Sequence, residues 1–144
     1  MDSADDSVRG SSAAFLIRVG RCHEPLAPEP MILDLDLLGR IALGRGEQDR
    51  LVQEDDRSRL ELADPWMSGE HAQIETFRAG PELWAILEDR GSTNGCRVNG
   101  QEVDRHQLEH GDLVELGQTF WSYYQAPLED KEQVLERAHD GGPV

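Results

Sequence analysis

Basic residues and long apolar segments are scarce in this chain of 144 residues. Lys and Arg number 14 against 29 Asp and Glu, so the formal net charge is −15. Such an acidic surface repels nucleic acid and anionic membranes, because contacts to phosphate groups need clustered Lys and Arg. No apolar run approaches the roughly 18 residues of a membrane-spanning helix. We therefore expect no direct nucleic-acid partner and no membrane contact.

Cysteine is also rare, with only Cys22 and Cys96, and the sequence does not establish whether the two meet. The first residues, "MDSADDSVRGSS", are acidic and polar, which argues against a signal peptide. A reducing, cytoplasmic location follows, in which free thiols are the default. Trp66, Trp84 and Trp121 are interpreted as core or rim packing rather than a platform for stacked bases, given the acidic charge.

Short apolar segments alternate with turn signals at spacings near ten residues, which predicts an all-β sandwich. The prolines of residues 21–30 and the charged residues of 46–58 predict a loop in each segment. Asn99-Gly100 is a two-residue hairpin signal. The expected strands lie at 14–20, twice within 31–45 with a turn near Gly39, at 59–64, 72–78 and 83–89, twice within 96–104, and twice within 108–125 around Gly117.

Three segments are expected along the chain. Residues 1–12 are polar and acidic and are predicted to be disordered. Residues 13–126 form the sandwich domain. Residues 127–144 begin with a short helix in "LEDKEQVLERAHD", which either docks on the sandwich or starts a linker.

Four polar motifs lie in loops or at strand ends: Gly44-Arg45, Ser68-Gly69-Glu70-His71, Ser92-Thr93-Asn94-Gly95 and Asn99-Gly100. Loops at the same end of an antiparallel sandwich meet in space, and binding sites are often built from such loops. The first three motifs are therefore candidates for one shared site.

The side chains of these motifs suit a phosphorylated peptide better than a reaction. Arg45 offers a planar fork of donors for a dianionic phosphate, and Ser68 and Thr93 offer hydroxyls. The amide of Asn94 can pair with the N–H and C=O of an extended peptide. The set holds no nucleophile with a base beside it, so we expect a binding module without enzymatic activity, cofactor or metal.

The ordered motifs resemble the forkhead-associated (FHA) domain. "LGRGEQ", "SGEHAQI", "LEDRGSTNGCRVNGQEV" and "LEHGDLVELG" follow one another as in that family, over about residues 14–125. The resemblance implies a sandwich of about eleven strands of the FHA/SMAD-like type, with the ligand loops at one end. It also implies preference for phosphothreonine over phosphoserine, through a small pocket for the threonine methyl group.

The resemblance also assigns roles. Arg45, Ser68 and Thr93 bind the phosphate and Asn94 holds the peptide backbone. Gly69 and Ser92 are possible additional contacts; Gly44, His71, Gly95, Asn99 and Gly100 support the loops. The expected partner is a phosphothreonine-containing protein, either a substrate of a Ser/Thr kinase or the kinase itself, in signalling or transcription regulation.

Two positions depart from the family pattern. Gly69 and Glu70 stand where members often carry Arg or Asn followed by a basic residue. A carboxylate at Glu70 would weaken binding if it pointed into an anion site. Arg50, Arg57 or Arg59 are candidates to supply the missing positive charge.

Two alternatives remain open. One is an FHA-like scaffold that binds its partner without phosphate or acts in oligomerisation, motivated by Gly69, Glu70 and the acidic charge. The other is a metal-dependent enzyme that uses His106, His110, Glu109 and Asp112, whose spacing matches no established ligand pattern.

Overall fold

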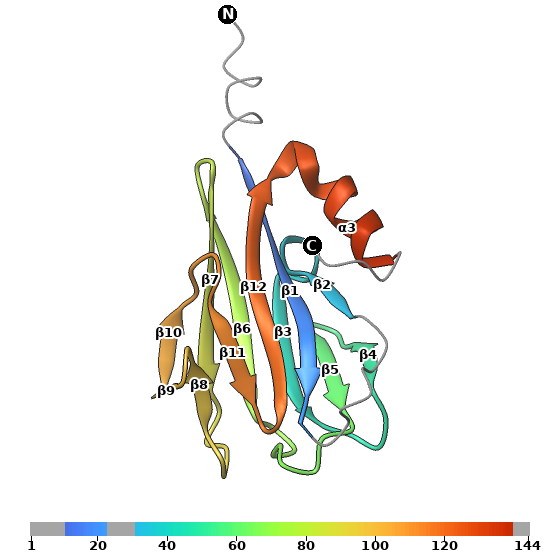
Figure 1. Ribbon diagram of the computed structural model, residues 1–144, viewed down its shortest axis with the longest axis vertical. Helices are drawn as coiled ribbons and strands as arrows, with labels where there is room; N and C mark the ends of the chain where they lie inside the picture. The colour runs from blue at the N-terminus through green and yellow to red at the C-terminus, as the bar shows by residue number, and fades with distance from the viewer. Residues whose placement is uncertain (1–10, 23–30, 140–144) are drawn as a thin grey trace, which may run out of the picture.

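The computed structural model describes residues 11–22 and 31–139, which form two facing six-stranded β-sheets (Figure 1). The first sheet has the order β2-β1-β12-β11-β8-β9 and the second β10-β7-β6-β3-β5-β4. The predicted all-β sandwich is therefore confirmed. The strands of the first sheet are β1 (Ser12–Arg21), β2 (Ile32–Asp34), β8 (Cys96–Val98), β9 (Gln101–Val103), β11 (Leu113–Leu116) and β12 (Thr119–Pro127). Those of the second are β3 (Arg40–Arg45), β4 (Arg50–Gln53), β5 (Ser58–Leu62), β6 (Ala72–Ala79), β7 (Glu82–Asp89) and β10 (Arg105–Gln107).

The core lies between the sheets and is filled by alternate residues of their strands. Trp121 and Tyr123 of β12 pack in the same apolar cluster as Leu43 of β3 and Leu60 of β5, and all four are fully or almost fully buried. Side chains two apart on a strand share a face, so strands such as β5, β7 and β12 supply the core with alternate residues.

Of the two strands predicted in residues 31–45, the one after Gly39 is present as β3, whereas the one before Gly39 is wrong in part. Residues Leu35–Leu38 form a short helix, α2, instead of continuing β2. The Asp34 carboxylate accepts the N–H of Leu37, and Gly39 ends the turn at φ +70°, with its N–H donating to the Leu35 carbonyl. The alternation of leucines was misleading because Leu37 is 78 % exposed.

The prediction of a loop over residues 46–58 is also wrong, because β4 lies within it. Leu51 of β4 faces Leu60 of β5 in an antiparallel pair, and Leu51 is nevertheless 47 % exposed. An edge strand held by backbone pairing needs little burial, so its sequence carries no apolar alternation. The three-residue strand β10 was missed for the same reason.

The helix expected in residues 128–140 is present as a short 3-10 turn, η1 (Leu128–Asp130), followed by α3 (Lys131–His139). Val134 is buried in a small second apolar cluster with Ala13 and Phe15 of β1. Lys131 Nζ lies 2.8 Å from Asp34 Oδ2. The helix therefore docks on the sandwich. Residues 1–10 of the expected disordered segment, and residues 23–30 of the expected proline-rich loop, lie outside the described residues, whereas Ser12 already begins β1.

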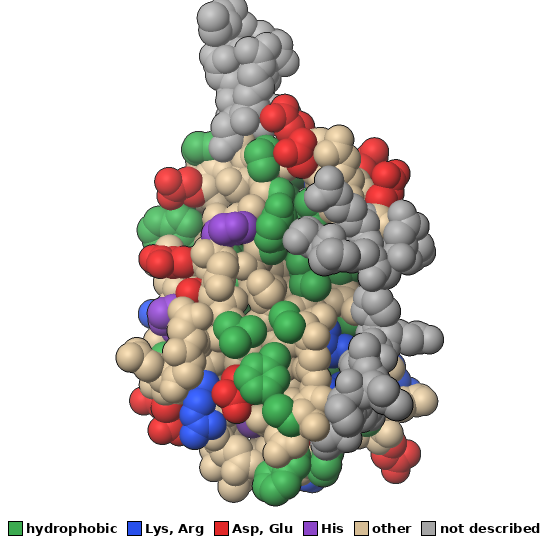
Figure 2. Space-filling model, viewed as in Figure 1, with side chains coloured by type: hydrophobic (Ala, Val, Ile, Leu, Met, Phe, Trp, Pro, Cys, Tyr) green, Lys and Arg blue, Asp and Glu red, His purple; other side chains and the backbone are tan. Residues whose placement is uncertain are grey.

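Basic side chains are sparse on the face shown in Figure 2, where acidic side chains lie mainly toward the edges of the view. Hydrophobic side chains form small patches between them. No helix of the described part of the chain is long and apolar enough to cross a bilayer.

Candidate phosphopeptide site

Three loops meet at the end of the sandwich drawn at the bottom of Figure 1. They follow β3, β5 and β7; Arg45 is the last residue of β3, and Ser68 and Thr93 lie in the loops after β5 and β7. The backbone N–H of Arg45 donates to the Ser68 carbonyl at 2.9 Å. The backbone N–H of Thr93 donates to Ser68 Oγ at 3.0 Å. Ser68 thus joins the loops on either side of it.

The Ser68 hydroxyl is an acceptor in the bond from Thr93. A hydroxyl also has one proton to donate, so Ser68 retains a donor for another group. Asn94 likewise uses only part of its hydrogen-bonding capacity, since its side-chain N–H₂ donates to the Trp66 carbonyl at 2.8 Å. Its side-chain carbonyl keeps its capacity to accept.

Arg45 is exposed at the end of β3. Among the residues that the structure describes, no carboxylate or other acceptor pairs with its guanidinium group. Most other arginines of the described chain carry an ion pair, as Arg50 does with Glu61 at 2.7 Å. Arg45 is therefore a cation held at a loop junction with its donors open to a ligand.

His71 supports these loops from inside and is fully buried. Its Nδ1 accepts the backbone N–H of Ser68 at 3.1 Å, so the proton of the neutral ring is on Nε2. That nitrogen lies 2.7 Å from the Gly95 carbonyl, to which it donates. One imidazole thereby ties the loop of Ser68 to the "GSTNG" turn.

The "GSTNG" turn is shaped by its own side chains. Asp89 Oδ1 accepts both the backbone N–H and the hydroxyl of Ser92, at 3.2 and 2.6 Å. Ser92 Oγ in turn accepts the N–H of Gly95 at 2.9 Å. Gly95 has φ +80°, a left-handed conformation that favours glycine. Ser92 thus shapes the turn from within.

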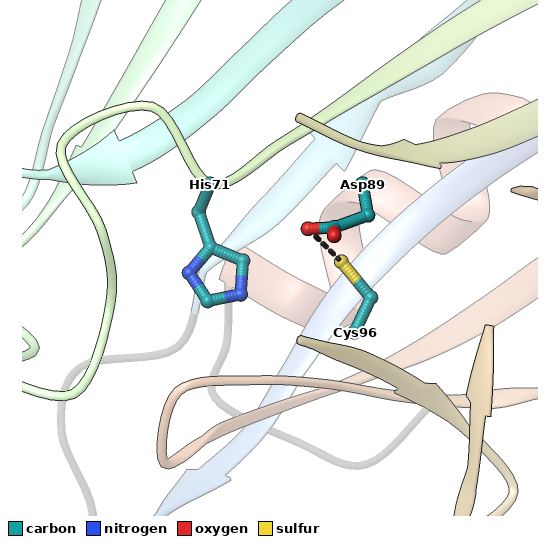
Figure 3. Close-up of side chains that lie close together, drawn as sticks. All are labelled: His71, Asp89 and Cys96. Carbon is teal, nitrogen blue, oxygen red and sulfur yellow. Dashed lines mark hydrogen bonds between the residues drawn. The ribbon is translucent and has the colours of Figure 1, made fainter. Parts of the chain in front are cut away.

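His71, Asp89 and Cys96 lie close together beneath this turn (Figure 3), with ligand atoms within 4.8 Å of one another. Cys96 Sγ donates to Asp89 Oδ1 at 3.6 Å. Burial, together with the negative charge of Asp89, raises the pKa of the Cys96 thiol to about 12. Because both nitrogens of His71 already bond to the backbone and the thiol holds its proton, these residues fit a hydrogen-bonded core better than a metal centre.

Burial also disfavours ionisation of Asp89, but the hydrogen bonds from Ser92 and Cys96 outweigh it and lower the pKa of this carboxyl. Asp89 is thus an anion that organises the turn.

Gly44 allows the first two loops to approach closely. A Cβ built on Gly44 would lie 1.9 Å from the carbonyl oxygen of Gly69 and 3.1 Å from a guanidinium nitrogen of Arg59. That guanidinium group donates to the Gly69 carbonyl at 2.6 Å. Of the three arginines considered from the sequence, Arg59 therefore lies against the Ser68 loop.

Arg57 and Arg50 are held in ion pairs with carboxylates, Arg50 in the pair with Glu61 described above. Arg57 pairs with Glu54 at 3.0 Å and with Glu70 at 3.6 Å. The side chain of Glu70 is 69 % exposed. Its carboxylate is thus drawn toward Arg57.

A buried polar network lies beneath the first two loops and was missed from the sequence. Arg21 at the end of β1 donates to Asp49 Oδ1 at 3.0 Å and to Thr119 Oγ1 at 3.1 Å. Thr119 donates to Asp64 Oδ2 at 2.7 Å. Asp49 follows Arg45 by four residues and Asp64 precedes Ser68 by four, so one chain of bonds anchors both loops.

The Asp49 carboxylate is bound at both oxygens. Oδ2 pairs with Arg18 at 2.7 Å, and Oδ1 also accepts the N–H of Ala63 at 2.8 Å. Burial raises the pKa of Asp49, but the bonds from Ala63, Arg21 and Arg18 outweigh it, so the pKa is lowered. No signal in the sequence identifies this network, because its members are up to 98 residues apart.

Asn99 and Gly100 form the hairpin between β8 and β9, with φ of +53° and +83°. Asn99 also donates to Asp112 Oδ1 at 2.9 Å and accepts the N–H of Leu113. Asp112 pairs with His106 at 3.3 Å. His110 is tied instead to the N–H of Gln125, so these two histidines do not converge on one ligand position.

The comparison with protein-family models matches the FHA domain over residues 41–117, slightly more than half of the chain. The chain belongs to the FHA family. FHA domains are phosphoprotein-interaction modules, and the likeness to solved members extends over most of the described sandwich.

Among these solved members is a domain studied for phosphothreonine-dependent FHA interactions; it is 26 % identical, with a TM-score of 0.56, over 81 % of this chain and 99 % of that one. The FHA domain of FhaA, in complex with the intracellular domain of Rv3910, is 25 % identical with a TM-score of 0.53, over 76 % and 98 %. Yeast Pml1p, at 17 % identity and a TM-score of 0.62 over 80 % and 83 %, shares the fold.

A curated relative is the human angiogenic factor with G patch and FHA domains 1, which is 40 % identical over 52 residues. The match covers 31 % of this chain and 7 % of that protein, and the mouse counterpart is 41 % identical over 49 residues. The chain thus spans a small part of the length of these relatives.

Proposed function

We propose that this FHA domain binds phosphothreonine-containing peptides at the junction of its three loops. Arg45, Ser68 and Thr93 take the phosphate, and Asn94 takes the peptide backbone. The observation that carries the proposal is that Ser68 accepts two hydrogen bonds. Its backbone carbonyl accepts the N–H of Arg45, and its hydroxyl accepts the N–H of Thr93. These bonds bring the backbones of Arg45, Ser68 and Thr93 together, which supports a shared role of the three residues in binding one ligand.

Charge supports the same location. The chain carries −15 overall, so a phosphate needs a local excess of donors. Arg45 supplies a guanidinium group without a carboxylate partner in the described part of the chain. Arg59 places a second guanidinium group against Gly69, although this one also lies 3.6 Å from a carboxylate oxygen of Glu61. Bonds between a guanidinium group and phosphate are charge-assisted and can be bidentate.

Glu70 is the residue that opposes this function. Its carboxylate pairs with Arg57 at 3.6 Å, which draws it aside and neutralises part of its charge. A long-range repulsion remains, and it is screened at physiological salt because the side chain is exposed. Glu70 therefore weakens phosphate binding modestly and does not abolish it.

Calorimetry with a phosphothreonine peptide and its unphosphorylated twin tests the proposal. A peptide library supplies the sequence around the phosphothreonine. We expect binding only of the phosphorylated form, and weaker binding of the phosphoserine analogue. Equal affinity for phosphorylated and unphosphorylated peptides would contradict it.

A second candidate function is phosphate-independent partner binding or oligomerisation. The exposed carboxylate of Glu70 beside the Ser68 loop favours it. Capture of the same partners before and after phosphatase treatment of the partner pool would support this alternative, and loss of all of them would support the phosphate-dependent function.

The biological setting is part of the same proposal. We infer that the partner is a substrate of a Ser/Thr kinase or the kinase itself, and that the domain acts in the cytoplasm in signalling or transcription regulation. Phosphorylation supplies a charge of about −2 and strong acceptors, which a site of arginine and hydroxyl donors can distinguish from an unmodified threonine.

A further inference from the structure

A pocket of about 300 Å³ opens at the edge of the sandwich, between the start of β7 and the second half of β12. Neither Lys nor Arg is among its lining residues. It is bordered by Glu82, Leu83 and Trp84 of β7, by Glu109 and His110, and by Gln125 of β12. Its volume is at the lower end of the range of small-ligand sites.

An exposed indole forms one wall. Trp84 lies on the outward face of β7, with Leu83 and Ala85 pointing into the core on either side, and it is 42 % exposed. Its Nε1–H donates to Glu82 Oε2 at 3.0 Å, which fixes the ring beside a carboxylate. Phe77, directly opposite Trp84 in the pairing of β6 and β7, is 45 % exposed.

The opposite wall is fixed by hydrogen bonds. The backbone N–H of Gln125 donates to His110 Nδ1 at 3.0 Å, and the His110 ring tilts against Tyr124 with centroids 4.9 Å apart. The side chain of Gln125 donates to the Leu83 carbonyl at 3.0 Å, which joins β12 to β7. Glu109, which precedes His110, is exposed and also borders the pocket, so its carboxylate adds a second negative charge to that of Glu82.

We propose that this pocket binds the side chain of a lysine or arginine presented by a protein partner. Glu82 and Glu109 supply negative charge, and the face of Trp84 attracts cations through its quadrupole. Arg78 reaches the rim of the pocket, where it donates a hydrogen bond to the Ser12 carbonyl. Its guanidinium group also forms an ion pair of 3.3 Å with Asp36. The pocket therefore offers acceptors and an aromatic face to a cation from outside.

A protein partner fits these features because apolar surface adjoins the pocket. Phe77 and Trp84 form an exposed aromatic pair on one sheet face, and such residues are common anchors of protein interfaces. The carboxylates beside them repel nucleic acid and anionic lipid and attract a basic partner.

The pocket is separate from the candidate phosphopeptide site. Glu82 begins β7 and Asp89 ends it beside the "GSTNG" turn, so the two sites lie roughly 23 Å apart along one strand. A short phosphopeptide cannot fill both. Binding of a cation at the pocket can therefore be measured with ligands that carry no phosphate.

The test uses the whole chain labelled with ¹⁵N and two tripeptides, acetyl-Gly-Arg-Gly-amide and the same peptide with citrulline, which is nearly isosteric and uncharged. We expect the arginine peptide to shift the indole N–H resonance of Trp84 in a saturable way. Citrulline should bind at least about fivefold more weakly, because the charge contribution is lost. The R45A variant should bind the arginine peptide unchanged.

Substitutions separate the pocket from general charge effects. E82Q/E109Q keeps the indole and should weaken binding of the arginine peptide about fivefold. The matched control D55N/E132Q removes two exposed carboxylates elsewhere and should leave binding within about twofold. W84A should also weaken binding of the arginine peptide, measured in this variant by the shifts of the backbone amides of Leu83 and Leu108.

Three results would overturn the proposal: no saturable shift with the arginine peptide, equal binding of the citrulline peptide, or an equal loss in E82Q/E109Q and in D55N/E132Q. Self-association of the chain that disappears in W84A, together with no response to the arginine peptide, would assign this face to a second copy of the chain instead.

Discussion

Ser68 Oγ accepts the backbone N–H of Thr93 at 3.0 Å, across a gap of 25 residues in the sequence. This bond joins the loop after β5 to the turn after β7. It uses a lone pair of the Ser68 hydroxyl and leaves its proton for another acceptor. The same oxygen can therefore hold the loops together and face a phosphate.

Replacing Arg45 by Ala should lower the affinity for a phosphothreonine peptide about 10- to 100-fold, the effect of losing charge-assisted hydrogen bonds. The melting temperature should be unchanged, because the described chain offers this side chain no partner. Calorimetric titration measures the first and a thermal scan the second. R105A removes another exposed arginine, on β10, and serves as the control, with unchanged affinity.

Ser68→Ala and Thr93→Val should differ in their effects. Ser68→Ala removes the acceptor of the Thr93 N–H as well as a phosphate donor, so affinity should fall about tenfold and stability by about 1 kcal/mol. Thr93→Val leaves that N–H in place, so affinity should fall with little change in stability. Peptide titrations and urea unfolding of both variants check this, and unchanged affinity in both would count against the assigned roles.

Asp49→Asn should destabilise the fold by about 2 kcal/mol at neutral pH, because it replaces the anion that Arg18 and Arg21 bind. The pKa of Asp49 is lowered in the folded protein, so its contribution is complete above the ordinary value of 3.8 and is lost as the pH falls through the lowered value. The stability difference from the wild type should therefore shrink as the pH falls below 3.8.

Urea unfolding at several pH values measures this difference. Glu54→Gln, which breaks the surface pair of Glu54 with Arg57, should cost less than about 1 kcal/mol and serves as the control. A difference between Asp49→Asn and wild type that persists undiminished in acid would refute the assignment.

His71→Ala should lower the free energy of unfolding by about 3 kcal/mol, because it empties a buried site and leaves the Ser68 N–H and the Gly95 carbonyl without this partner. Chemical denaturation measures it, with His106→Ala on the partly exposed His106 as the milder control. Addition of Zn²⁺ or of a chelator should not change the wild-type melting temperature; a chelator-sensitive fold would instead indicate a metal at His71, Asp89 and Cys96.

The two cysteines should react differently with a thiol reagent. Both are free thiols; Cys22 is exposed and Cys96 is buried. Since the pKa of Cys96 is raised to about 12, almost none of it is thiolate at mildly alkaline pH. We expect one thiol to react in the native protein and both after denaturation, as measured by absorbance and by mass spectrometry of the labelled peptides. Rapid native labelling of Cys96 would mean that the "GSTNG" turn opens.

The fold class followed from local patterns. Alternating apolar residues such as those of 83–89 place one face of a strand in the core, and Asn99-Gly100 tolerates the positive φ of a tight hairpin. The pattern failed where backbone pairing rather than burial makes a strand, as in β4. It also failed at Leu37, where Asp34 and Gly39 cap a helical turn.

The candidate site divides in the same way. The sequence by itself determined which side chains stand at the loop tips, because "GR", "SGEH" and "GSTNG" are short motifs with fixed local chemistry. Tertiary structure decided what those loops rest on: Arg21 reaches Asp49 and Thr119, 28 and 98 residues away. It also decided that Glu70 pairs with Arg57 while Arg59 lies against Gly69, since contacts between the ends of two strands and their loops depend on how the chain folds and not on spacing along it.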